Sequence, residues 1–275
     1  MDSPRSSPPL TDLDLLELQA EMSMDNRRRI AGACGVTIAV ARDGQRLFIG
    51  SDVPDTLVAA LVAAVDRSPL APVPDVGPPA LGACRAIVES CCGPLSVEAG
   101  PSYLIEGNVQ FALRAEIVRS DAPPDERLRR LNPGNWEPDE WGELLGGVLG
   151  PWAMAVGGRR VVSICHTPAR MTERAAECGV WTQPDYRGRG YAAAVTAAWA
   201  EILRPSGRYL FYSTDAENVS SQRVAARLGL RLIGWMWRLS SAGGGQSDQR
   251  HPLSRRRTPP IWARSPPARR CGAVP

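Results

Sequence analysis

The 275-residue chain carries 32 basic and 29 acidic residues, and all of its basic residues are arginine. A net charge of +3, without a concentrated basic segment in the part expected to fold, argues against a nucleic-acid-binding protein. Apolar residues make up 44 % of the chain, enough for one large or two small packed domains, and no apolar run approaches the roughly 20 residues of a membrane helix.

The seven cysteines and two histidines are not arranged as metal ligands. A structural zinc site needs four ligands at short paired spacings, and the chain has no Cys-x-x-Cys pair, so we expect no metal. The odd number of cysteines and a start without an apolar leader predict reduced thiols and a cytoplasmic location, with no membrane partner. The adjacent Cys91 and Cys92 are expected to be packed rather than bridged or catalytic.

The first 118 residues are predicted to hold a disordered leader and a small α/β region that lacks a chemical motif. Residues 1–10 are rich in Ser and Pro. Thr11 or Asp12 can cap an amphipathic helix that runs to Met24. Strands over 35–40 and 46–49 flank Asp43-Gly44, a strong hairpin signal. A helix over 54–65, a Pro-rich connector over 68–79 and a further α/β stretch complete the region 11–118.

Helices and strands alternate clearly over 119–240. Two helical stretches within 122–147 are separated at Asn132-Pro133-Gly134 and carry Trp136 and Trp141 as apolar anchors. The predicted elements that follow are strands over 153–156, 161–165 and 176–182, a helix over 188–203, a strand over 209–214, a helix over 219–228 and a last strand over 230–239. Residues 241–275 are rich in Gly, Pro, Ser and Arg and are predicted to be a disordered tail.

The segment 179–194 contains the most informative pattern, a strand and a turn followed by a Gly-rich helix start. Gly188 and Gly190 lack side chains, so a ligand can approach the backbone closely. The first turn of the helix offers unpaired N–H groups and the positive end of the helix dipole. Arg187 and Arg189 add positive charge beside it. The pattern therefore predicts a phosphate or pyrophosphate site.

Two kinds of protein fit such a site. The run Gly188-x-Gly190-x-x-Ala193 matches a dinucleotide-binding fingerprint, and Asp215 follows the next strand, where a ribose-binding acid would lie. However, the five residues 183–187 separate the strand from the glycines, and only one β-α-β unit is visible. A dinucleotide-binding oxidoreductase is therefore kept as an alternative.

The second interpretation rests on two motifs in order. Arg187-Gly-Arg-Gly-Tyr-Ala192 resembles the Arg-x-x-Gly-x-Gly/Ala signature of the GNAT superfamily of N-acetyltransferases. Downstream, 215–230 resembles the second GNAT motif, Asn-x-x-Ser before a helix that ends in Leu-Gly-Phe, with Leu230 in place of the Phe. The resemblance covers about 117–239, and its pattern is most similar to the branch of ribosomal-protein alanine N-acetyltransferases. It implies an α+β fold whose mixed, mostly antiparallel sheet is flanked by helices.

The resemblance also implies acetyl-CoA as co-substrate and assigns residues to it. The central strand would splay from its neighbour, hold the pantetheine arm and point a backbone N–H at the thioester oxygen. The pyrophosphate would lie on the amides that follow Gly188. Asn218 would contact the pantetheine or a water near the thioester, or it would only cap a helix. The residues implied for the cofactor are Val180, Trp181, Thr182, Arg187, Gly188, Arg189, Gly190, Tyr191, Ala192, Ala193 and Asn218.

Amide formation from a thioester needs a base for the amine and a proton for the leaving thiolate. Glu177, on the predicted central strand, is the candidate base, and a structural role would explain it equally well. Many relatives carry a Tyr acid where this chain has Ala225, which leaves Tyr212, Ser221 or water. Cys178 and Cys165 could in principle carry an acyl group, but neither has an identifiable base.

We therefore predict acetyl transfer to a primary amine of an unidentified acceptor, either a small molecule or a protein N-terminus. A non-catalytic acyl-CoA-binding sensor or interaction module is the other alternative, and the absent Tyr favours it. The N-terminal region is either a degenerate second GNAT-like half or an unrelated domain that shapes the acceptor cleft. In the latter case, residues 119–240 alone should bind CoA but lose acceptor turnover.

Overall fold

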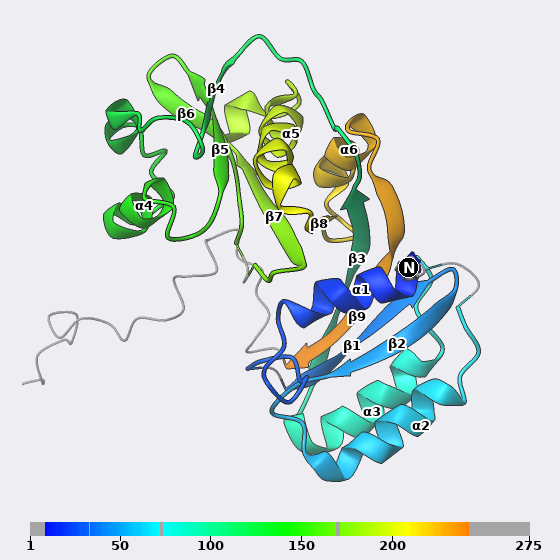
Figure 1. Ribbon diagram of the computed structural model, residues 1–275. Helices are drawn as coiled ribbons and strands as arrows, with labels where there is room; N and C mark the ends of the chain where they lie inside the picture. The colour runs from blue at the N-terminus through cyan, green and yellow to red at the C-terminus, as the bar shows by residue number, and fades with distance from the viewer. Residues whose placement is uncertain (1–8, 33, 72–73, 169–170, 242–275) are drawn as a thin grey trace, which may run out of the picture.

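A computed structural model describes residues 9–32, 34–71, 74–168 and 171–241 (Figure 1). Nine strands form one sheet in the order β2-β1-β9-β3-β8-β7-β6-β5-β4. The β7–β8 pair is parallel, and every other neighbouring pair among the described strands is antiparallel. This confirms the predicted α+β class with a mostly antiparallel sheet. The predicted disordered leader and tail lie almost wholly outside the described residues, in which no helix is long and apolar enough to cross a membrane.

The first part of the chain builds one end of the sheet and covers both of its faces (Figure 1). The elements are α1 (Asp12–Glu21), β1 (Gly35–Ala41), β2 (Gly44–Ile49), η1 (Asp55–Leu57), α2 (Val58–Asp66) and α3 (Ala80–Cys92). Side chains alternate along β1, as they do along any strand. Val36, Ile38 and Val40 pack with α2 and α3, whereas Ala39 and Ala41 pack with α1.

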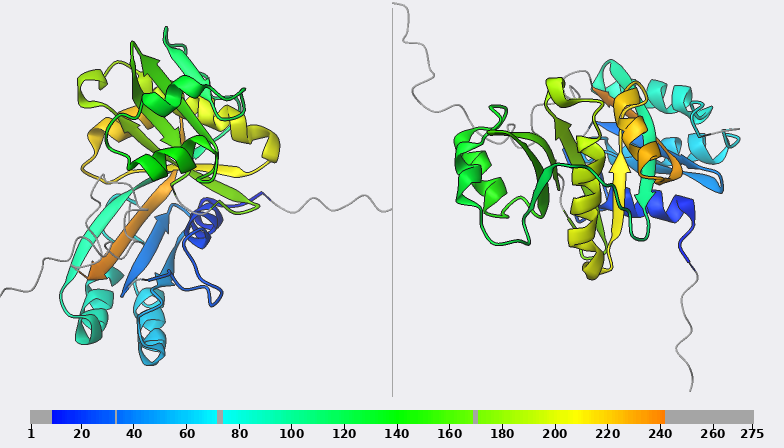
Figure 2. Two further views of the ribbon diagram at one scale, coloured as in Figure 1. Left: turned by 90° about the vertical axis from the view of Figure 1, so that its left-hand side faces the viewer. Right: turned by 90° about the horizontal axis from the view of Figure 1, so that it is seen from above.

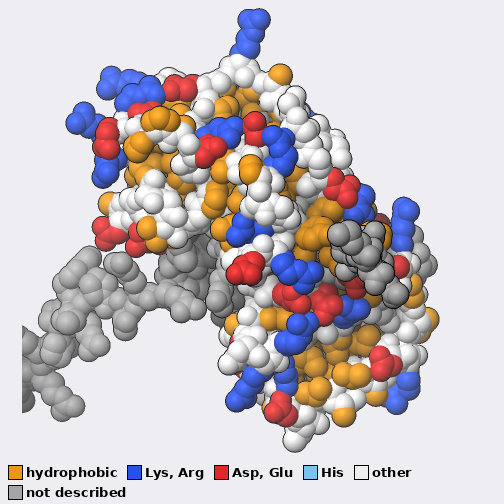
Figure 3. Space-filling model, in the orientation of Figure 1, with side chains coloured by type: hydrophobic (Ala, Val, Ile, Leu, Met, Phe, Trp, Pro, Cys, Tyr) orange, Lys and Arg blue, Asp and Glu red, His pale blue; other side chains and the backbone are white. Residues whose placement is uncertain are grey.

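Helix α1 is fixed in place at its start and along its exposed side. Thr11 caps it as predicted, because its hydroxyl accepts the amide of Asp14 while the Asp14 carboxylate accepts the Thr11 amide at 3.1 Å. Glu17 pairs with Arg28 at 2.7 Å and also with Arg46 of β2. Figure 3 shows acidic and basic side chains interspersed over this face rather than gathered by sign. These contacts set the position of the helix, and so of the buried Gln19 on it.

The second part of the chain forms the other end of the sheet. Its elements are β4 (Glu116–Arg119), η2 (Glu126–Arg130), α4 (Pro138–Leu145), β5 (Trp152–Gly157), β6 (Arg160–His166), β7 (Ala175–Thr182), η3 (Pro184–Tyr186), α5 (Tyr191–Leu203), η4 (Arg204–Ser206), β8 (Tyr209–Ser213), α6 (Val219–Arg227) and β9 (Arg231–Ser241). Helices α4 and α5 lie on opposite faces of this end, as the right panel of Figure 2 shows. Trp141 of α4 and Trp199 of α5 are each buried against the strands.

Strand β3 (Leu95–Ile105) joins the two parts into one sheet. It comes from the first part of the chain but lies between β8 and β9 of the second. Ser102 is paired with Ser213 of β8, and Gly100 is paired with Met236 of β9. A fragment of residues 119–240 would lack this central strand, so the topology argues against the expectation that such a fragment binds CoA by itself.

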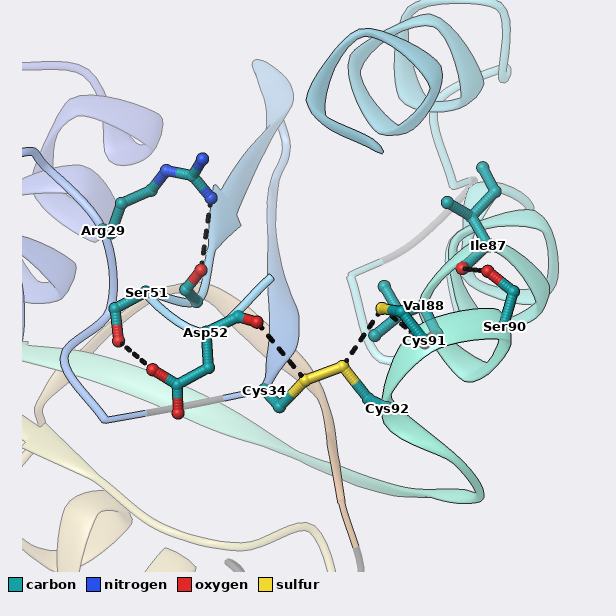
Figure 4. Close-up of a disulfide and its surroundings, with 10 residues drawn as sticks. Arg29, Cys34, Ser51, Asp52, Ile87, Val88, Ser90, Cys91 and Cys92 are labelled. Carbon is teal, nitrogen blue, oxygen red and sulfur yellow. Dashed lines mark hydrogen bonds between the residues drawn. A yellow bond between two sulfur atoms is a disulfide. The ribbon is translucent and has the colours of Figure 1, made fainter. Parts of the chain in front are cut away.

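Cys34 and Cys92 form a disulfide between the start of β1 and the end of α3 (Figure 4). The expectations that the thiols are reduced and that Cys92 is unbridged are therefore wrong for this pair. The two residues are 58 apart in sequence and meet only because α3 packs on β1. A crosslink that closes a loop of this length stabilises the fold by about 4 kcal/mol in the chain-entropy description.

Candidate active site

Strand β7 changes its hydrogen-bonding partner halfway along its length. Its first half, Ala175 to Cys178, pairs with β8, and the parallel ladder ends at the Cys178–Tyr212 pair. Its second half, Gly179 to Thr182, pairs only with β6 among the described strands. The edge of β7 that faces β8 therefore has no strand partner from Gly179 onward. This is the splayed central strand that the sequence predicts.

A cavity of about 390 Å³ opens from this splay toward α5 and α6. We call it the arginine-rich cavity, because its lining includes the side chains of Arg187, Arg223 and Arg227 and no carboxylate. It also includes the second half of β7 and the first turn of α5. Three guanidinium groups beside a helix N-terminus form a site suited to a polyanion.

The turn before α5 has the shape that its two glycines permit. Gly188 and Gly190 have φ angles of +76° and +90°, which residues with a Cβ rarely adopt. Gly190 is the N-cap of α5, and a Cβ there would lie 2.9 Å from Cε1 of Phe111. The carbonyl oxygen of Gly188 accepts hydrogen bonds from Arg227 at 3.4 and 3.5 Å. The turn therefore lines the cavity together with the first turn of α5.

The residues predicted to bind the cofactor meet here, with one exception. The lining contains Val180, Trp181, Thr182, Arg187, Gly188, Gly190, Tyr191, Ala192, Ala193 and Asn218. The exception is Arg189, whose guanidinium lies over the ring of Tyr186 at 5.4 Å from its centroid rather than lining the cavity. Sequence reasoning missed Arg223 and Arg227, which repeat four residues apart on α6 and so share one helix face.

Two hydroxyl groups and an amide meet where β8 faces α6. The hydroxyl of Tyr212 lies 2.5 Å from Oγ of Ser221. Burial raises the pKa of Tyr212, so the phenol keeps its proton at neutral pH. Asn218 caps α6, because its side-chain oxygen accepts the amide of Ser221 at 3.1 Å. All three residues line the splay, so Asn218 both caps a helix and borders the cavity.

A second cavity, of about 570 Å³, lies on the opposite face of the sheet, beneath α1. We call it the acidic cavity, because Glu98, Glu177 and Asp215 line it and Arg238 is the only basic residue that does. Its floor is one face of β1, β9 and β3, and the segment that follows α1 closes one side. Sequence reasoning missed most of it, because its walls come from both parts of the chain.

Glu177 is half-buried in the wall of the acidic cavity. Its Oε1 accepts a hydrogen bond from Nε2 of Gln19 at 2.9 Å and another from the hydroxyl of Ser213. Burial raises the pKa of this carboxyl above its usual 4.5, although the two hydrogen bonds and the charge of Arg238 act in the opposite direction. A raised pKa brings a carboxylate closer to the range in which it accepts protons effectively.

The two cavities meet at the splay. Gly179, Val180, Tyr212, Asn218 and Ser221 line both of them. An anionic ligand in one and a cationic ligand in the other would therefore approach each other at the point where β7 and β8 diverge, with Glu177 on the acidic side. The predicted catalytic residues Glu177, Tyr212 and Ser221 are thus brought to one place.

The two nearby cysteines have the wrong environment for acyl carriers. Cys165 and Cys178 are buried in the core under α5. Burial, with a contribution from Cys165, raises the pKa of Cys178 well above its usual value. A thiol in this state is a poor nucleophile at neutral pH.

Known proteins are similar to part of this chain. Residues 112–231 match the model of the acetyltransferase (GNAT) domain. No curated protein sequence matches the chain. Among solved structures, a putative GNAT acetyltransferase from Novosphingobium aromaticivorans is 23 % identical over 53 % of this chain and 66 % of its own, with a TM-score of 0.40. The chain thus spans just under two thirds of that protein.

Two further solved structures are similar over longer stretches. An acetyltransferase of the GNAT family from Colwellia psychrerythraea is 13 % identical, covering 85 % of this chain and 97 % of its own, with a TM-score of 0.45. A GCN5-related N-acetyltransferase-like protein from Streptococcus suis is 16 % identical over 74 % and 83 %, with a TM-score of 0.40.

Proposed function

We propose that this protein transfers an acetyl group from acetyl-CoA to a primary amine at the junction of its two cavities, because residues 112–231 match the acetyltransferase (GNAT) domain model. The observation that carries the proposal is the splay of β7 from β8, with an arginine-rich cavity on one side and the half-buried carboxylate of Glu177 on the other. Acetyl-CoA is a co-substrate in this account, and no metal takes part.

The arginine-rich cavity is assigned to acetyl-CoA. The pyrophosphate would lie on the first-turn amides of α5, beside Arg187, because a helix N-terminus binds anions well. The pantetheine arm would follow the free edge of Val180 to Thr182, and Asn218 borders its path. The thioester would then reach the shared wall of the two cavities, where a backbone N–H of β7 can polarise its oxygen.

The amine enters from the acidic cavity as an ammonium ion, and Glu177 takes its first proton. The nitrogen lone pair then attacks the thioester carbon, so that a C–N bond forms and the C–S bond breaks. The nitrogen loses its second proton as the amide forms, and the sulfur of CoA gains one. Each turnover therefore releases one proton to solvent, and the reaction needs no acyl-enzyme intermediate.

Tyr212, through its contact with Ser221, is the group we assign to the leaving thiolate. Its hydroxyl lies at α6, the helix on which many relatives carry a Tyr acid. Here Ala225 takes that position and is fully buried. Tyr212 of the neighbouring strand β8 thus places a hydroxyl beside α6, where Ala225 has none. The presence of this hydroxyl favours catalysis over a non-catalytic binding module.

The sheet topology argues against the oxidoreductase alternative, whereas the acceptor and the location remain predictions. A dinucleotide-binding oxidoreductase of the doubly wound type would need a largely parallel sheet, whereas β7–β8 is the one parallel pair among the described strands. The branch of ribosomal-protein alanine N-acetyltransferases would imply a protein N-terminus as acceptor. The cytoplasmic location also stays a prediction.

The experiment is a transfer assay with the full chain, acetyl-CoA and a panel of primary amines. Release of free CoA thiol and an acetyl group on the amine, detected by mass spectrometry, are the expected results. The Glu177→Gln variant should bind acetyl-CoA but transfer far more slowly. Binding of acetyl-CoA without transfer to any amine would favour the non-catalytic module instead.

A further inference from the structure

The acidic cavity contains polar atoms that no part of the described protein satisfies. Ser102 is completely buried, and its hydroxyl has no hydrogen-bond partner among the described residues. Gln19 is 6 % exposed, and its Oε1 is also unpartnered there. Both residues line the cavity. Buried polar atoms are nearly always hydrogen-bonded to protein or to ordered water, so the contents of the cavity must supply the missing partners of these two atoms.

The unpartnered atoms are disposed to receive hydrogen bonds. The Gln19 amide donates from Nε2 to Glu177, which places its acceptor Oε1 beside the same carboxylate. A hydroxyl such as that of Ser102 also has lone pairs to offer. Ser102 shares one face of β3 with Glu98 and Gly100, because side chains alternate along a strand and the bulge comes only after Ser102. The cavity therefore calls for a ligand rich in N–H donors.

The charges of the cavity point the same way. Glu98 of β3 lies opposite Arg238 of β9 and pairs with it at 3.4 Å, so these two largely offset each other. Glu177 and Asp215 make no ion pair with any described residue. Two unpaired carboxylates give the cavity a net negative charge, which favours a cation and disfavours a ligand that carries its own carboxylate.

The two unpaired carboxylates lie on neighbouring segments, Glu177 on β7 and Asp215 just after the end of β8. Ser213 contacts Glu177, and Asp215 is two residues further on. The chain stays extended there, because the amides of Thr214 and Ala216 bond to β3 at 3.2 and 2.8 Å. Side chains two residues apart in an extended chain lie on the same face, so Asp215 lies about 7 Å beyond Ser213, on the side of the chain that contacts Glu177. Asp215 is exposed, so it stands at the mouth of the cavity while Glu177 lies within.

We propose that the acceptor is a small aliphatic diamine, whose reacting ammonium binds at Glu177, Gln19 and Ser102 and whose second ammonium binds at Asp215. The inference rests on the proposed function, since it names the substrate of the same site. A monoamine would leave Asp215 unpaired, and an amino acid would bring its carboxylate against it.

Three acceptors with four carbons each separate these cases: 1,4-diaminobutane, 1-aminobutane and 4-aminobutanoate. The full chain should acetylate the diamine with a kcat/KM several-fold above that of the monoamine, and the aminobutanoate should be the poorest acceptor. Asp215→Asn should reduce the diamine-to-monoamine ratio by roughly two- to five-fold, the range expected for one solvent-exposed ion pair. Glu217→Gln is the matched control, because Glu217 is exposed nearby but does not line the cavity, and the ratio should not change.

Binding is measured separately, by calorimetry of the three compounds with the CoA-bound protein. Saturable binding of the diamine that weakens in Asp215→Asn supports the inference even at slow turnover. If kcat/KM for the aminobutanoate or the monoamine equals or exceeds that for the diamine, the inference is overturned and the proposed function still stands. Absence of transfer to every amine contradicts the proposed function, and absence of diamine binding then contradicts the inference as well.

Discussion

Replacing Glu177 by Gln should separate the chemistry of this residue from its packing. A Gln side chain has the same size and keeps an oxygen that can accept the hydrogen bonds of Gln19 and Ser213. The site should therefore retain its geometry and lose only its capacity to take a proton. General-base catalysis contributes typically 10²- to 10⁴-fold, so we expect kcat to fall by roughly that factor while acetyl-CoA binding is unchanged.

The pH dependence of the transfer rate gives a second test of Glu177 as the base. Burial raises the pKa of Glu177 above 4.5, and the carboxylate is the active form. The native rate should therefore rise with pH through a midpoint above 4.5, and this limb should be absent from the residual rate of Glu177→Gln. Glu177→Asp keeps a carboxylate on a shorter stem and should recover part of the rate together with the limb.

Ionisation of Glu177 should lower the stability of the fold, although it raises the rate of transfer. Because the folded protein binds this proton more tightly than the unfolded chain does, ionisation of Glu177 lowers the free energy of unfolding as the pH rises from 4.5 through the raised pKa. Glu177→Gln removes that loss, so denaturant titration at pH 7 should find it no less stable than the native protein. A variant that keeps the native rate would refute the assignment of Glu177 as the base, and a variant that is less stable at pH 7 would contradict the raised pKa.

Three further predictions concern the frame of the site. Tyr212→Phe removes the proton donor but keeps the ring, so the transfer rate should fall while calorimetry shows unchanged acetyl-CoA binding; an unchanged rate would assign the leaving-group proton to water. Gly100→Ala places a Cβ 1.8 Å from the backbone oxygen of Thr214, so denaturant titration should show a loss of about 1–3 kcal/mol or more. A fragment of residues 119–240 lacks β3 and should show no cooperative thermal unfolding; a folded fragment that binds CoA would show that β3 is dispensable.

The local parts of the structure could be predicted from the sequence because their signals are local. Asp43-Gly44 marked the β1–β2 hairpin, Thr11 marked the start of α1, and Gly229 follows the end of α6 at Arg227. The turn at Gly188 and Gly190 was recognisable for the same reason, since positive φ angles and an open helix start need those residues. Half of the lining of the arginine-rich cavity comes from one continuous stretch, 179–193, and most of the residues in that stretch were anticipated.

The acidic cavity could not be predicted in this way. Gln19 and Glu177 are 158 residues apart and meet only because β3 is inserted between β8 and β9. Hydrophobic periodicity and turn signals are local, so they do not show which strands far apart in the sequence will pair. The Cys34–Cys92 disulfide was missed for the same physical reason, because its two halves come together through the packing of α3 on β1.

Binding of acetyl-CoA to the arginine-rich cavity is the central claim, and one substituted glycine tests it directly. Gly188 is the better position, because an added Cβ there meets no heavy atom within 4 Å, whereas one at Gly190 would press on Phe111. Gly188→Asp and Gly188→Asn should strain the backbone equally, because each new side chain must adopt the positive φ of this position. The two variants then differ only by one negative charge.

Calorimetry of acetyl-CoA with the native chain and both variants is therefore the decisive measurement. We expect saturable binding of acetyl-CoA to the native chain. Binding to Gly188→Asp should be roughly ten-fold or more weaker than binding to Gly188→Asn, because the Asp carboxylate lies beside the pyrophosphate. No binding to the folded native chain, or equal binding by the two variants, would contradict it.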